Sequence, residues 1–138
     1  MPHYLNVFIV LAATAICLEV AGHTLAQDVE KPKPIIVNGN NNESTKAELD
    51  QLAQTAGDSK LIIMIARLGN AESSRKLNRH RLQMLSSYLE TVRAIPKHRI
   101  VKAEGESIRG LGRIEVYLDG KLFMIFTLER NKYFAPEP

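Results

Sequence analysis

The stretch from Lys60 to Leu89, KLIIMIARLGNAESSRKLNRHRLQMLSSYL, holds the two most regular patterns of the chain. Its first seven residues, KLIIMIA, are almost continuously apolar and too short for a helix, which indicates a central strand covered on at least one face. From Leu77 onward the apolar residues recur at helical spacing, so a helix is predicted over 72–93, with Pro96 marking its exit. Residues 67–70 then form the loop between this strand and this helix.

Two weaker patterns precede this unit. The β-branched patch Ile35–Val37 is flanked, not interrupted, by prolines, which is typical of an edge strand. Ser44 or Thr45 can cap a helix that follows, and Glu48, three residues after Thr45, completes a capping box. Gly57 is expected to close this helix.

The last third of the chain has strand patterns. Residues 99–104 alternate weakly between apolar and polar and predict a strand, and residues 105–112 form a loop. The segments 113–118 and 121–128 flank Asp119-Gly120, a hairpin signal because a type I′ turn needs positive φ at both central positions. The apolar run in the second segment is most simply a core strand; at a sheet edge it could instead pair with another protein.

The order of elements is β-α-β-α-β followed by β-β, without an internal repeat. This order predicts an α+β fold, a two-layer sandwich with two helices packed on one face of a mixed sheet. A chain of 138 residues suits one such domain. We expect a tether and possible first edge strand at 27–43, the α+β domain at 44–128 and a loose C-terminal tail at 129–138.

The N-terminal residues have the pattern of a targeting segment. Val7–Leu18 is an unbroken run of apolar and small residues, too short to span a bilayer, and small residues at Thr24 and Ala26 suit a signal peptidase. Residues 1–26 are therefore predicted to be a cleaved signal peptide, and the mature chain to be exported without a transmembrane segment. In a bacterium it would be periplasmic or associated with the cell envelope. The first six residues contain no Lys or Arg, so an uncleaved membrane anchor stays open.

Cysteine usage and charge narrow the class of protein. The only cysteine, Cys17, lies within the predicted signal peptide, so a disulfide scaffold is excluded for the mature chain. Cleavage removes one acid, Glu19, and no base, which raises the formal net charge from +3 to +4. A basic exported protein attracts cell-wall polymer, lipid headgroups or nucleic acid, and charge alone selects none of them.

Arg81 has an unusual position. On a helical wheel of about 100° per residue it falls in the middle of the apolar arc. A guanidinium that is buried and unpaired is strongly unfavourable, so Arg81 must reach solvent, pair with an acid or bind a ligand anion. Two possibilities stay open: an internal pair with Glu104, Glu106 or Glu115, or a ligand at the nearby loop 67–70, where open α/β sheets often bind ligands.

The residues around Arg81 also follow a family pattern. The matching positions are Ala66, Gly69, Leu77-Asn78, Arg81-Leu82 and Tyr88-Leu89, followed in part by Ala103–Glu106 and by Arg113-Ile114-Glu115. Through these residues the run from Lys60 to Val116 resembles the peptidoglycan-associating domain at the C-terminus of outer-membrane protein A, in peptidoglycan-associated lipoprotein and in flagellar motor stator proteins.

The resemblance implies noncovalent binding of the peptidoglycan stem peptide. In the family an aspartate and an arginine hold the charged groups of diaminopimelate. Arg81 matches this arginine, and a guanidinium fork suits a carboxylate well. Ala66 stands where the family has its aspartate, so half of the charge pair is absent from that position.

The sequence therefore predicts an exported noncatalytic binding module of the cell envelope. Arg81 is the expected ligand contact, Gly69 allows close backbone approach, and the neighbours are Arg67, Ser74 and Asn78. The alternative is a degenerate copy of the same fold that has lost its cell-wall site and binds a protein partner in the envelope.

Other classes of site have weaker patterns. No catalytic residue, metal site or cofactor is predicted, because the histidines lack metal-ligand spacing and the pair Glu104 and Glu106 has no accompanying nucleophile. The basic run at the start of the predicted helix is expected to be a solvated face rather than a nucleic-acid contact. This run comprises Arg75, Lys76, Arg79 and His80.

Overall fold

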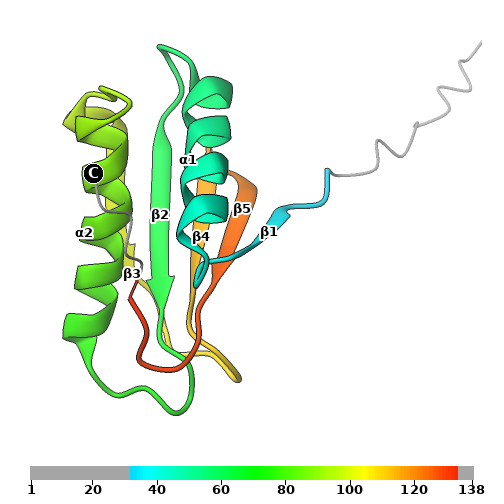
Figure 1. Ribbon diagram of the computed structural model, residues 1–138, viewed down its shortest axis with the longest axis vertical. Helices are drawn as coiled ribbons and strands as arrows, with labels where there is room; N and C mark the ends of the chain where they lie inside the picture. Colours follow the sequence, from blue (N-terminus) through cyan, green and yellow to red (C-terminus); the bar gives the residue numbers. More distant parts are fainter. Residues whose placement is uncertain (1–31, 134–138) are drawn as a thin grey trace, which may run out of the picture. The chain divides into compact units, whose positions relative to one another are not determined.

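The computed structural model describes residues 32–133. The predicted signal peptide lies outside the described residues, as do 27–31 of the tether and 134–138 of the tail. The elements are β1 (Ile35–Asn38), α1 (Asn42–Ala56), β2 (Ile62–Arg67), α2 (Arg75–Thr91), a 3-10 turn η1 (Lys97–Arg99), β3 (Ile100–Glu104), β4 (Arg113–Leu118) and β5 (Lys121–Thr127) (Figure 1). Within 32–133, neither helix combines the length and the apolar character needed to cross a membrane.

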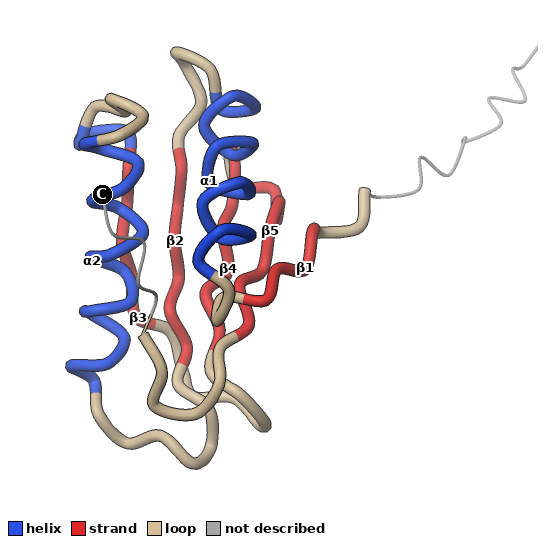
Figure 2. The backbone as a smooth tube through the Cα atoms, viewed as in Figure 1, coloured by secondary structure: helices blue, strands red, loops and turns tan. Residues whose placement is uncertain are grey.

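The five strands form one mixed sheet in the order β1-β5-β4-β2-β3. β1 is parallel to β5 and β3 is parallel to β2, whereas β4 is antiparallel to both of its neighbours. Both helices lie on the same side of this sheet (Figure 2), so the α+β class and the mixed sheet are confirmed. β1 is an edge strand, as predicted, and the apolar strand β5 lies between β1 and β4 in the core.

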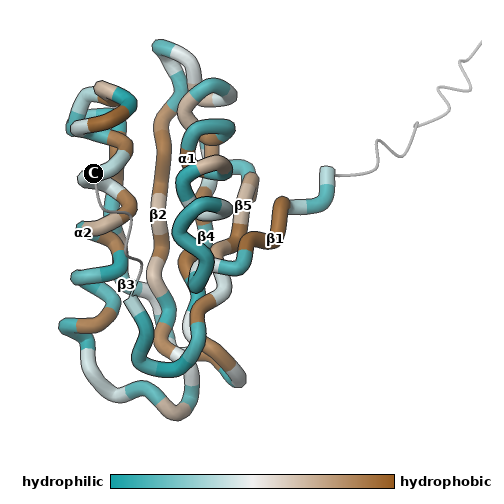
Figure 3. Tube along the Cα trace, in the orientation of Figure 1, coloured by the Kyte–Doolittle hydropathy of each residue, from teal (hydrophilic) through white to brown (hydrophobic). Residues whose placement is uncertain are grey.

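The core lies between the sheet and the two helices. Every second residue of β2 faces the helices, and Ile62, Met64 and Ala66 are completely buried. Leu49 and Leu52 of α1 and Leu85 and Leu89 of α2 cover them. Burial of each such aliphatic side chain contributes roughly 1.5–3 kcal/mol. In Figure 3, β2 is coloured as hydrophobic along most of its length, in agreement with the predicted central strand.

The first helix begins earlier than predicted. The cap is Asn41, whose side-chain oxygen accepts a hydrogen bond from the backbone N–H of Ser44 at 3.1 Å. Thr45 is buried in the first turn and its hydroxyl has no partner, so the predicted capping box with Glu48 does not form. Asparagine is a better N-cap than threonine, and the core takes up the threonine side chain.

The second helix is shorter than predicted at both ends. It begins after Ser74, and the residues before it belong to the loop. At its C-terminal end the chain turns through Ala94, which has a φ of 52°, and the N–H of Ile95 donates to the carbonyl of Leu89. Pro96 follows this turn, as the sequence indicates. The hairpin prediction is confirmed, because Asp119 and Gly120 both have positive φ, 48° and 78°.

The described part of the tail, residues 129–133, contacts the rest of the domain. The N–H of Glu129 donates to the side chain of Asn40, and the ring of Tyr133 packs edge-on against His80 with centroids 4.5 Å apart. The main chain at Asn131 and Lys132 is bonded to buried charges. The tail therefore lies against the domain up to Tyr133, and the loose tail at 129–138 stays a prediction.

Candidate functional site

The buried Arg81 of α2 is paired with Glu72 in the loop before the helix. Two parallel hydrogen bonds join them: Nη1 donates to Oε2 at 3.0 Å and Nη2 donates to Oε1 at 2.7 Å. The side chain of Arg81 is 0% exposed and that of Glu72 is 2% exposed. Paired forks of this kind are among the strong hydrogen-bonded contacts in proteins. The arginine in the apolar arc thus has its counter-ion inside the same chain.

Main-chain groups complete this ion pair. The backbone N–H of Gly69 donates to Glu72 Oε2 at 2.9 Å, and that of Asn131 donates to Oε1 at 2.8 Å. Nε of Arg81 donates to the carbonyl of Lys132 at 3.0 Å. Each of the three guanidinium nitrogens therefore has a partner within the domain. A buried ion pair is tolerated only when such additional bonds satisfy the remaining polar atoms.

These bonds also determine the ionisation of Glu72. Burial raises the pKa of its carboxyl group, but the bonds from Arg81, from Gly69 and from Asn131, together with the positive charge of Arg81, outweigh burial. The pKa is lowered from 4.5 to about 2. The carboxylate is therefore ionised at neutral pH, and Glu72 is not a proton donor there.

Two glycines let the surrounding loops approach the pair. A Cβ atom on Gly112 would lie 2.4 Å from Glu72 Oε2 and 2.6 Å from Arg81 Nη1. A Cβ atom on Gly69 would lie 2.4 Å from the carbonyl oxygen of Gly110. Both positions require the absence of a side chain. The predicted close approach at Gly69 is thus made to a neighbouring loop of the same chain.

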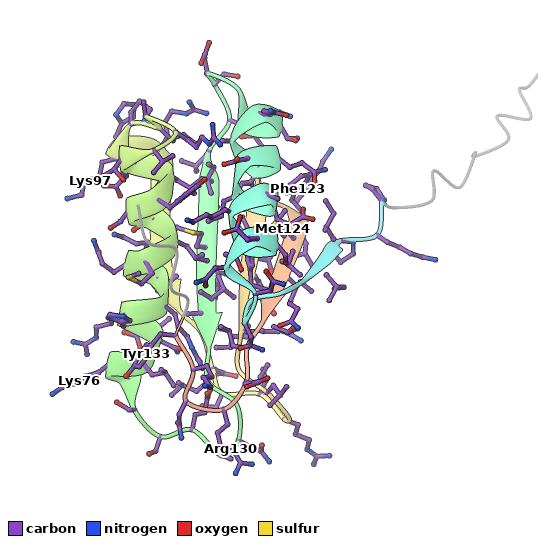
Figure 4. All side chains as sticks on the ribbon, viewed as in Figure 1. Lys76, Lys97, Phe123, Met124, Arg130 and Tyr133 are labelled. Atoms are coloured by element: carbon purple, nitrogen blue, oxygen red, sulfur yellow. The ribbon has the colours of Figure 1, made fainter. Side chains whose placement is uncertain are left out.

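A small cavity of about 130 Å³ lies beside the Glu72 carboxylate. It is lined by Asn70, Ala71, Glu72, Gly110, Leu111, Gly112 and Arg130. Arg130 is the cation of this cavity, and in Figure 4 it lies at the same end of the domain as Lys76 and Tyr133. A more open groove of about 400 Å³ lies between α2 and β3, where Arg79 is paired with Glu104 at 3.2 Å.

The structure brings only some of the predicted site residues together. Gly69 bonds Glu72, and the side-chain N–H of Asn78 donates to the carbonyl of Ala66 at 3.2 Å, so both lie near Arg81. Arg67 follows Ala66 on the strand and therefore points to the opposite face of the sheet. Ser74 is exposed and makes no capping hydrogen bond with its side chain.

The acid beside Arg81 is not one of the three that the sequence suggested. Glu104 pairs with Arg79, and Glu115 pairs with Arg67 and Arg113 on the other side of the sheet. Glu72 was missed because the helix predicted over 72–93 included it, and nine positions at about 100° each place it on the side opposite Arg81. In the structure it belongs to the loop before α2. Its position just before a helix that buries an arginine is the one signal that could have identified it.

The described residues contain no group of three or more His, Cys, Asp or Glu side chains that could hold a metal ion. Comparisons with protein-family models, with curated proteins and with solved structures find no match to this chain.

Proposed function

We propose that this protein is a noncatalytic binding module of the cell envelope whose arginine site is occupied by its own glutamate, and that it binds a protein partner in place of the cell wall. The observation that carries the proposal is the complete burial of Arg81 with a partner on each guanidinium nitrogen. Export is inferred from the apolar run at 7–18, and the fold type from the resemblance of Lys60–Val116 to peptidoglycan-associating domains.

Energetics favour the internal pair over a ligand. A stem-peptide carboxylate that approached Arg81 would have to displace Glu72, whose carboxylate is held in place by two backbone N–H groups. Separating the partners of a buried ion pair costs about 3–5 kcal/mol when no substitute is present. Glu72 thus provides, within the chain, the negative charge that a wall ligand would bring to this arginine.

The test is cosedimentation of the purified protein with isolated peptidoglycan sacculi, with free diaminopimelate as competitor. We expect that the protein does not bind the sacculi specifically, so that free diaminopimelate does not change the amount of protein in the pellet. The measurement is made at about 0.15 M salt and again at higher salt, because a basic protein binds anionic polymer without specificity at low salt. Arg81→Lys is compared with Arg79→Lys, a change on the exposed face of the same helix. Specific pelleting that only Arg81→Lys abolishes, in a folded variant, would overturn the proposal.

A second candidate function is binding of the stem peptide after the tail has moved. The observation that favours it is that two main-chain atoms, Asn131 N and Lys132 O, bond the tail to the ion pair. A chain that ends at Leu128 tests this candidate in the same assay. If removal of the tail creates pelleting that diaminopimelate competes away, Arg81 retains a ligand site that the tail blocks.

A further inference from the structure

The sheet has one face that neither helix covers. Strand alternation places eight apolar residues on this face, which we call the open face: Ile36, Ile63, Ile65, Val101, Ala103, Tyr117, Leu122 and Ile125. Ile36 is 63% exposed and Val101 is 42% exposed, and the other six are half-buried. In the view of Figure 1 this face lies behind the sheet, opposite α1 and α2.

Strand pairing makes these side chains continuous. One row across the sheet runs from Ile36 through Ile125, Glu115 and Ile65 to Ala103. The next row consists of Leu122, Tyr117, Ile63 and Val101. Side chains of directly paired residues lie about 4.5–5.5 Å apart and touch. Glu115 is the one charged residue within these two rows.

Such a face is unusual for a sheet that meets water. A strand with one solvated face normally alternates apolar and polar residues, whereas a strand covered on both faces is continuously apolar. β2 reads IIMIAR and has no polar residue before Arg67. Apolar patches of a few hundred Å² on a protein surface are often functional. The sequence of β2 is therefore suited to a covering layer on the open face as well.

The charges at one end of the open face indicate which charged group the partner carries. Glu115 accepts hydrogen bonds from Arg67 at 3.1 Å and from Arg113 at 2.8 Å. Its side chain is only 6% exposed, whereas those of Arg67 and Arg113 are 26% and 38% exposed. Two guanidinium groups thus share one covered carboxylate and face outward with a net positive charge. A carboxylate on the partner complements this end.

The apolar area of the open face fits one helix more closely than a whole second copy of the domain. Five strands about 4.8 Å apart and two rows about 7 Å apart give an apolar patch of roughly 300 Å². A stable interface between two proteins buries about 800 Å² on each partner. An α-helix with its side chains is about 10 Å wide, so one helix of a few turns is long enough to cross the patch.

We propose that the open face docks an amphipathic helix of a partner protein, with the apolar stripe of the helix on the two rows and a carboxylate side chain of the helix between Arg67 and Arg113. The inference rests on the proposed function, because it specifies the partner that the module binds. On the opposite face of the sheet, α1 and α2 pack against the strands.

The experiment is photo-crosslinking of the full chain in the cells that produce it. A benzophenone amino acid replaces Val101 on the open face or, as control, Val92 at the end of α2; both valines are 42% exposed. We expect an adduct only from position 101, and its mass spectrum should identify a partner peptide with an apolar stripe and an acidic residue. An adduct with a second copy, with the chain's own residues 1–31, or no adduct would overturn the inference.

A charge reversal then tests the recognition itself. The crosslinked segment is synthesised with a fluorophore and titrated with the full chain. Arg113→Glu is expected to weaken binding by about tenfold, the scale of a close charge pair at an interface. Changing the acidic residue of the peptide to lysine should restore binding to this variant. Val101→Glu should also abolish binding, whereas Val92→Glu should not. Equal binding by all variants would overturn the inference.

The two proposals fail in different ways. Specific pelleting with sacculi overturns the proposed function whatever the crosslinking shows. Absence of a crosslink at position 101 overturns only the docking of a helix on the open face, and leaves the closed arginine site as it stands.

Discussion

Glu72 and Arg81 are joined by two parallel hydrogen bonds of 3.0 and 2.7 Å, although nine positions and the start of a helix separate them in the sequence. This pair connects the loop after β2, the helix α2 and the tail, because Gly69, Asn131 and Lys132 each add a main-chain bond to it. An arginine in the apolar arc of a helix thus serves as a centre to which three segments are attached.

The stability of the domain should depend on the ionisation of Glu72. Its pKa in the folded protein is about 2, below the ordinary value of 4.5, so the folded state binds this proton less readily than the unfolded state. The contribution is complete above about pH 4.5 and is lost as the pH falls toward 2, which amounts to about 3 kcal/mol. Urea unfolding at a series of pH values measures it.

Glu72→Gln is the control for this titration, because other carboxyl groups contribute in the same direction. The pKa of Glu115 is also lowered: burial raises it, but the bonds from Arg113, Arg67 and Tyr117 outweigh burial. The free energy of unfolding of the Gln variant should therefore still fall at low pH, but less steeply than that of the wild type. If its pH profile has the same slope as that of the wild type, Glu72 is not responsible for the loss.

The losses in the free energy of unfolding from removing the two partners of the ion pair should not be additive. Arg81→Met leaves the Glu72 carboxylate buried without its counter-ion, and Glu72→Gln leaves the guanidinium in that state; each is expected to lower the free energy of unfolding by about 3–5 kcal/mol. The double variant should lose clearly less than the sum. Chemical denaturation of the four proteins gives the coupling energy, and additive losses would show that the two side chains do not interact.

Gly112 should not tolerate a side chain. A methyl group there would meet both Glu72 and Arg81 at less than contact distance, so Gly112→Ala is expected to lower stability by about 1–3 kcal/mol, the usual cost of overpacking. Ser107→Ala, in the same loop and exposed, is the matched control and should change little. A neutral Gly112→Ala would mean that the loop moves away from the pair without cost.

The sequence predicts those features that depend on neighbouring residues. The hairpin at Asp119-Gly120, the closure of α1 by Gly57 and the buried strand β2 follow from local conformational preference and from strand periodicity. The pairing of Arg81 with Glu72 depends instead on how a loop folds back on a helix. No spacing rule relates these two residues, so the acids suggested from the sequence were not the partner.

The contacts of the tail could be predicted from the sequence even less than the ion pair. Residues 129–133 fall in the tail that the sequence predicts to be loose, and no pattern in them predicts contacts with the domain. In the structure they lie against the domain, where the main-chain N–H of Asn131 and the carbonyl of Lys132 complete a buried ion pair. Main-chain groups are the same at every position, so this role leaves no trace in the sequence. The turn at Asn131, with a φ of 58°, is its one local sign.

Removal of the tail should therefore loosen the ion pair without unfolding the sheet. A chain that ends at Leu128 loses one bond to Glu72 and one to Arg81. Each is of a kind that contributes about 1.5–3 kcal/mol to stability, and water can take the place of part of both. We expect a net loss of about 2 kcal/mol in the free energy of unfolding and a rise in the pKa of Glu72. An NMR titration of the Glu72 carboxyl carbon measures this pKa.

Arg130→Ala is the control, because its side chain makes neither bond, and it should leave the pKa of Glu72 unchanged. A truncated protein with the stability and the Glu72 titration of the wild type would show that the tail does not hold the pair, and the second candidate function would then lose its physical basis.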